Sequence, residues 1–175
     1  MKRIFLLLAI VGVTAFQSCS SDDDVVLTDN DTIAEVFEIN SNTTFTAGNG
    51  YTISYTLNPE IFSSDMILIY RLSGADGNDD VWEPLPQTYN FSNGDYLQYT
   101  FDFSVNNINI YIDSNFPAEQ EPAFSANQVF RVVIIPGYLS NKGTSASSSI
   151  DLSDYKAVIK AYGLNDSNIK TIGNR

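Results

Sequence analysis

The sequence predicts a mainly β protein: an antiparallel β-sandwich of about seven to nine strands with a short C-terminal helix. Two observations predict this class. Short segments in which large apolar residues alternate with polar ones recur along the chain, and turn-forming residues separate them roughly every eight to twelve positions. One late segment instead repeats its apolar residues at intervals of three and four, which is the period of an amphipathic helix.

The first strand candidates lie before residue 58. Residues 33–39 form the first, with Ile33, Phe37 and Ile39 on one face. The turn-forming runs 40–43 and 48–50 follow. Residues 51–57 alternate apolar and polar side chains, which indicates a half-buried strand that Pro59 ends.

The next stretch predicts a central strand followed by an edge. Residues 66–72 are almost continuously apolar, which is typical of a strand buried on both faces. Residues 73–80 are rich in glycine and aspartate, and we expect a loop there. Residues 81–87 hold two prolines, which favours an edge strand or a rigid extended segment. Residues 89–91 resume a strand before the turn at 92–95.

Residues 96–105 have the clearest alternation in the chain, and residues 108–112 follow as their expected partner strand. We expect one face of the first strand to enter the core, with Leu97, Tyr99, Phe101, Phe103 and Val105 on it.

The C-terminal part contains a loop, a buried strand and the helix. Residues 114–127 form the loop, and the apolar run 128–135 predicts a second strand buried on both faces. Residues 151–163 carry apolar residues at helical spacing, with Gly163 as a stop signal. Ile169 and Ile172 either add a last strand or pack against the domain.

The N-terminus carries a targeting signal. A basic start, an apolar run over residues 4–16 and small residues before Cys19 are typical of a secretory signal peptide. The apolar run is shorter than the roughly 20 residues that a membrane-spanning helix needs, which disfavours a membrane anchor helix. We expect a leader over residues 1–18, an acidic tether over 19–31 and a single domain over 32–175.

Residues 16–19, Phe-Gln-Ser-Cys, resemble the lipobox of bacterial lipoproteins, and Cys19 is the only cysteine. In that family the leader is cut before the cysteine, which then carries the lipid. Residues 20–24 resemble the acidic export signal of surface lipoproteins of the Bacteroidota, although a solvated linker has the same composition. The resemblance implies a protein of the cell envelope, anchored to the outer membrane through Cys19 on its periplasmic or surface face.

The region after Cys19 resembles a family of small, mostly uncharacterised Bacteroidota lipoproteins. The matching stretches are residues 34–38, 66–72, 81–88 and 127–136, of which Trp-Glu-Pro-Leu-Pro-Gln at 82–87 is the most distinctive. Some members carry a collagen-like insert that this chain lacks. Others are labelled dihydrolipoamide dehydrogenase, but that enzyme needs a dinucleotide fold and a redox cysteine pair. The resemblance therefore implies a fold and a location in the cell envelope, and it implies no activity.

Composition excludes several function classes. The chain has no histidine, which removes a Ser-His-Asp triad and an imidazole zinc site. It has no cysteine pair, and no glycine-rich nucleotide-binding motif. The net charge of −12 disfavours nucleic acid as a partner. A glycosidase needs two carboxylates, but no spacing singles out a pair among Glu35, Glu38, Glu83, Asp102 and Asp113.

Two candidate sites remain. Asp76, Asn78 and Asp80 offer alternate oxygen ligands, as calcium prefers, although a solvated hairpin tip has the same pattern. Trp82, Tyr89 and Tyr96 offer an aromatic platform for a sugar, although Trp82 is equally suited to filling the core or covering a sheet edge.

We therefore expect a binding or structural module and no enzymatic activity, with calcium as the one possible cofactor. The expected partners are the membrane, through the lipid on Cys19, and an envelope protein or a glycan. The alternative is a carbohydrate-binding or glycan-processing accessory protein.

Overall fold

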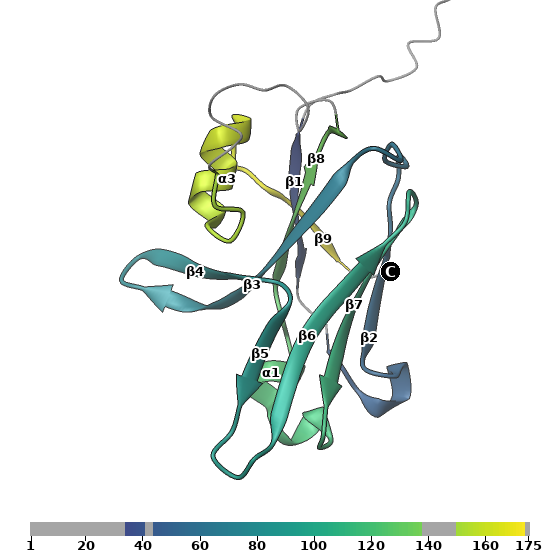
Figure 1. Ribbon diagram of the computed structural model, residues 1–175, viewed down its shortest axis with the longest axis vertical. Coiled ribbons are helices and arrows are strands. Elements are labelled where there is room, and N and C mark those ends of the chain that lie inside the picture. Colours follow the sequence, from purple (N-terminus) through teal and green to yellow (C-terminus); the bar gives the residue numbers. More distant parts are fainter. Residues whose placement is uncertain (1–33, 41–43, 138–149, 174–175) are drawn as a thin grey trace, which may run out of the picture. The chain divides into compact units, whose positions relative to one another are not determined.

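The computed structural model describes residues 34–40, 44–137 and 150–173 of the chain, and these residues form a β-sandwich (Figure 1). Nine strands are found in these residues, in two sheets that are antiparallel apart from one strand pair. The predicted fold class is confirmed. The expectations for the leader, for Cys19 and for the tether over residues 19–31 lie outside the described residues.

The larger sheet has the strand order β4-β3-β8-β1-β9 and the smaller one has the order β2-β7-β6-β5. The larger sheet consists of β1 (Glu35–Asn40), β3 (Met66–Asp76), β4 (Asp79–Pro84), β8 (Phe130–Ile135) and β9 (Lys170–Gly173). The smaller sheet consists of β2 (Thr52–Thr56), β5 (Gln87–Asn90), β6 (Tyr96–Phe103) and β7 (Asn107–Ser114). The helical elements are η1 (Ala47–Asn49), η2 (Ala118–Gln120), α1 (Pro122–Ser125) and α3 (Tyr155–Tyr162).

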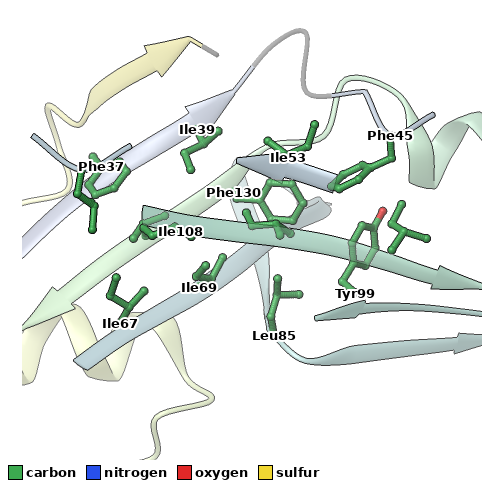
Figure 2. Packing of buried hydrophobic residues seen from close by; sticks show 14 of the residues in the cluster. Phe37, Ile39, Phe45, Ile53, Ile67, Ile69, Leu85, Tyr99, Ile108 and Phe130 are labelled. Atoms are coloured by element: carbon green, nitrogen blue, oxygen red, sulfur yellow. The ribbon is translucent and has the colours of Figure 1, made fainter. Parts of the chain in front are cut away.

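Both sheets contribute their inner faces to one apolar core (Figure 2). Period-two alternation sends every second side chain inward, so Ile67 and Ile69 of β3 meet Leu97 and Tyr99 of β6 there. Within this core, the rings of Phe45, Tyr99 and Phe130 pack edge to face, with centroids about 6 Å apart.

Helix α3 covers the outer face of the larger sheet (Figure 1). Its buried residues Tyr155, Val158 and Ile159 pack against side chains of β3 and β8. Asp154 caps its start by accepting a hydrogen bond from the Ala157 amide (3.1 Å), and Gly163 ends it with a left-handed φ of 66°. The helix explains why the sequences of β3 and β8 are apolar on both faces, as expected of central strands.

The C-terminal segment adds a strand. β9 pairs with β1 in parallel, with Phe37 opposite Lys170 and Ile39 opposite Ile172. Of the two alternatives for Ile172, the structure shows the strand.

Residues 73–80, expected as a loop, instead form the outer part of a long hairpin. Strand β3 continues to Asp76 and β4 begins at Asp79, with Gly77 and Asn78 as a two-residue turn. Gly77 has a φ of 64°, which suits the first central position of a tight hairpin turn. Both arms are exposed here, so no apolar alternation marks them in the sequence. These residues are strands because the backbones of β3 and β4 pair, and the alternation of apolar side chains does not show that pairing.

Strand β6 also departs from the expectation at its far end. Leu97 and Tyr99 are fully buried and Phe101 is half-buried, but Phe103 is 41% exposed and Val105 39%. Strand β5 pairs with β6 only as far as Tyr99, so the end of β6 is a sheet edge. Phe103 therefore lacks a neighbouring strand on one side.

Candidate functional site

An open pocket of about 290 Å³ lies between the β3–β4 hairpin and the start of α3. Its lining combines aromatic surface with charge, and the lining residues are Asp76, Asp79, Asp80, Val81, Trp82, Ser153, Asp154, Tyr155 and Lys156. Four carboxylates against one ammonium group give the pocket a negative potential. Pockets that combine an aromatic wall with a few polar groups are the usual places where proteins bind small ligands.

Three of the four carboxylates already have partners. Asp154 caps α3, Asp79 lies 3.5 Å from the Lys156 ammonium, and Asp80 lies 3.7 Å from the Arg131 guanidinium. Among the described residues, no hydrogen bond or ion pair involves the Asp76 carboxylate, and Asp76 is exposed. Asp76 is thus the carboxylate that is available to a ligand without breaking an existing contact.

Arg131 of β8 contacts Trp82 and Tyr155, the two aromatic residues that line the pocket. Its guanidinium carbon lies 4.0 Å from the centre of the Trp82 ring and 5.1 Å from that of Tyr155. Its Nη1 donates to the Tyr155 hydroxyl (2.9 Å). Because burial outweighs the nearby positive charge, the pKa of Tyr155 is raised to about 12. The hydroxyl therefore stays protonated to a higher pH than that of an exposed tyrosine.

Two carboxylates complete the surroundings of this arginine. Glu38 of β1 lies 3.5 Å from Nε of Arg131, and Asp166, beyond α3, lies 3.7 Å from its Nη1. Arg131 thus joins β1, β4, α3 and the segment after α3, which positions the helix against the hairpin.

The three residues predicted as a calcium site are spread along the hairpin rather than around one point. Asp76 pairs with Asp79 across the turn, while Asp80 pairs with Ala75 on the neighbouring ladder position. Asn78 lies in the turn and does not line the pocket. In the described part of the chain, no three histidine, cysteine, aspartate or glutamate side chains gather in a way that holds a metal ion. Calcium binding stays a prediction.

The three predicted platform aromatics lie in three different places. Trp82 lines the pocket against Tyr155. Tyr89 packs at the border of the inner core against Phe124, with ring centroids 4.7 Å apart. Tyr96 is on the outer face of the smaller sheet, where its hydroxyl donates to Asp113 (3.3 Å). Of the three, Trp82 alone lines the pocket.

Tyr89 belongs to a second polar cluster, centred on Arg71 of β3, which is 5% exposed. Arg71 donates to Gln128 Oε1 (2.7 Å), to the Tyr89 hydroxyl (3.1 Å) and to the Ala123 carbonyl (3.2 Å). Its guanidinium also lies over the rings of Tyr89, Tyr99 and Phe124, at 5.1–5.5 Å from their centres. Burial is the largest effect on both tyrosines, raising the pKa of Tyr89 to about 12 and the pKa of Tyr99 further. This cluster closes one end of the core.

The carboxylates considered as a glycosidase pair have separate surroundings. Glu38 lies beside Arg131, and Glu83 lies 3.7 Å from Arg71 and accepts a short hydrogen bond from Tyr89. Asp102 accepts hydrogen bonds from Tyr111 (2.5 Å) and Asn109 (2.8 Å), which lower its pKa. None of these three shares a partner with another.

Sequence reasoning missed the helix side of the pocket. Asp154, Tyr155 and Lys156 lie some seventy positions after the hairpin that they face. One signal was present, because Arg71 and Arg131 each interrupt an apolar run and a buried arginine needs partners. The identity of those partners was not readable from the sequence.

The chain matches no protein-family model, no curated protein and no solved structure. Within residues 34–40, 44–137 and 150–173, no helix combines the length and the apolar character needed to cross a membrane.

Proposed function

We propose that the chain is a lipid-anchored, non-catalytic binding or structural module of the bacterial cell envelope, held at the outer membrane through Cys19. The observation that carries the proposal is the position of the only cysteine, directly after a short apolar run and before an acidic segment. A small β-sandwich on such an anchor is suited to presenting a surface to a partner.

Metabolic labelling with a palmitate analogue in a bacterial host tests the anchor. The full-length chain takes up label and floats with membranes, and Cys19→Ala loses both properties. Ser20→Ala is the matched control, because it changes the neighbouring residue and keeps the thiol. Labelled Cys19→Ala protein would contradict the proposal.

A second candidate function is carbohydrate binding, and the position of Trp82 in an acidic pocket supports it. Aromatic faces bind the apolar faces of sugars, and carboxylates accept hydrogen bonds from their hydroxyls. The exposed Asp76 carboxylate would serve as such an acceptor.

A glycan array separates the two functions. Under the carbohydrate proposal, Asp76→Ala and Trp82→Phe weaken binding to the same glycans, because both line the pocket. Glu60→Gln is the control, since this exposed carboxylate lies in another loop. Binding that Trp82→Phe and Asp76→Ala leave unchanged would remove this pocket from the function.

A further inference from the structure

Three exposed large apolar residues gather at one end of the sandwich. The described residues contain five large hydrophobic side chains that are more than a third exposed, namely Phe62, Val81, Phe103, Val105 and Leu152. Phe62 lies in the β2–β3 loop, and Phe103 and Val105 lie at the tip of the β6–β7 hairpin. Single exposed apolar residues are ordinary, but a group of them marks a contact surface. We call Phe62, Phe103 and Val105 the apolar tip.

Hydrogen bonds hold the two loops together. The Ile61 amide donates to the Val105 carbonyl (2.9 Å) and the Leu57 amide donates to the Asn106 carbonyl (2.8 Å). Asp65 fixes the loop further, because its carboxylate accepts from the amides of Phe62 (3.0 Å) and Gly137 (3.1 Å). The apolar tip is therefore a preorganised surface.

The chain enters the domain at this same end. Glu35 begins β1 opposite Ile134, and Ile135 is opposite Met66, the first residue of β3. The β2–β3 loop leads directly into Met66, so it lies level with the start of β1 (Figure 1). Residues 20–33 join Cys19 to Ala34, and a fully extended chain of that length reaches at most about 50 Å. A lipid on Cys19 would thus attach the chain to the bilayer through the same end of the sandwich at which the apolar tip lies.

The charges near the apolar tip indicate which kind of lipid surface it can contact. Residues 57–65 and 103–107 contain Glu60 and Asp65 and no lysine or arginine. Attraction to anionic lipid headgroups is therefore absent at the apolar tip, and contact has to come from the apolar side chains.

We propose that the apolar tip rests in the interface of a zwitterionic lipid bilayer, since Phe62, Phe103 and Val105 project at the end where the tether from Cys19 joins β1. The proposal rests on the lipid anchor of the proposed function and adds a second membrane contact to it. Membrane binding through a lipid chain becomes firmer when a second contact supports it. The domain then contacts the membrane through the apolar tip as well as through the lipid on Cys19.

Spin labelling of the lipidated full-length protein tests the proposal. Because Cys19 carries the lipid, Val105→Cys supplies the one free thiol for a nitroxide. Ser92→Cys, in the exposed β5–β6 turn at the other end of β6, is the control. Both proteins are reconstituted into phosphatidylcholine–phosphatidylethanolamine vesicles. Relaxation by oxygen, which concentrates in lipid, is compared with relaxation by a water-soluble nickel chelate.

The expected result is that the label at position 105 is accessible to oxygen and protected from nickel, while the label at 92 is accessible to nickel. In the Val105→Cys protein, Phe62→Ser with Phe103→Ser shifts the label to the aqueous pattern without loss of folding or flotation. Val81→Ser with Leu152→Ser, which removes equally exposed apolar groups elsewhere, leaves it unchanged. Adding phosphatidylglycerol at low salt weakens the contact, because Glu60 and Asp65 are repelled.

Two results would overturn the proposal while leaving the anchor intact. Vesicle-bound protein whose label at 105 stays accessible to nickel would show that the tip is not in the bilayer. Spin–spin broadening between labels at 105 would show that a second copy covers it. Failure of the protein to float with vesicles at all would instead contradict the lipid anchor.

Discussion

Replacing Arg71 provides the sharpest test of how the core is closed. Arg71→Ala removes three hydrogen bonds from a charged donor and three ring contacts, at a side chain that is 5% exposed. It leaves Gln128 and the Ala123 carbonyl without these donors. Removing one member of a buried charged cluster costs about 3–5 kcal/mol, and hydrogen bonds to charged groups at about 1.5 kcal/mol each give a similar total.

Glu83 contributes less to that cost, because its side chain is 31% exposed and lies 3.7 Å from the guanidinium. We therefore expect Arg71→Ala to lower the free energy of unfolding by about 3–5 kcal/mol, and Glu83→Gln by about 1 kcal/mol or less. Arg71→Lys keeps the charge but loses the planar fork that serves Gln128, Tyr89 and Ala123 together, so we expect a loss of about 2 kcal/mol.

Urea unfolding measures these differences. Trp82, the only tryptophan, lies against Tyr155 and reports on α3 docking by its emission, while circular dichroism reports on the strands. The two probes should give one transition for each variant. A loss below about 1 kcal/mol for Arg71→Ala, with an unchanged urea slope, would show that water replaces the guanidinium at little cost and would refute the reasoning.

Three further predictions concern titration, metal and core. Burial raises the pKa of Tyr89 and of Tyr155 to about 12, above the value near 10 in the unfolded chain. The contribution of these two tyrosines to the free energy of unfolding is therefore fully present below about pH 10 and is lost as the pH rises toward 12. The urea midpoint should therefore fall above about pH 10, and a midpoint that stays flat to about pH 11 would contradict it. If calcium binds at Asp76, calcium should raise the melting temperature of the protein more than magnesium does, and more than sodium does at matched ionic strength. Equal increases with all three ions would contradict the calcium prediction. Phe101→Asp places a charge on the inner face of β6 and should unfold the domain or cost several kcal/mol, whereas Phe103→Asp, at the exposed end, should cost less than about 1 kcal/mol. Comparable losses for the two variants in urea unfolding would contradict the burial of Phe101 against the core.

The sequence alone determined the class of fold and most of its elements. Alternation in residues 96–101 and helical spacing around Val158 are local properties, because each depends on which face of one segment is buried. The apolar runs of β3 and β8 likewise predicted two central strands, and the prolines of residues 81–87 predicted the edge strand β4.

The ends of those elements were decided by neighbours in space. Phe103 has the same alternation as Leu97, and it is exposed because β5 stops pairing at Tyr99. The hairpin arms around Gly77 have no apolar pattern, and they are strands because their backbones pair. Neither the exposure of Phe103 nor the pairing of the hairpin arms can be predicted from the periodicity of one segment.

The candidate pocket belongs to the tertiary structure in the same way. The sequence placed Asp76 and Asp80 in one candidate site and Trp82 in another. Packing of α3 against the larger sheet brings all three together with Asp154 and Lys156. Arg131 makes that arrangement specific, because it contacts Trp82 and Tyr155 at once. Periodicity tells which face of a segment is covered, but the partner that covers it depends on how distant segments pack, and that was decided only by the tertiary structure.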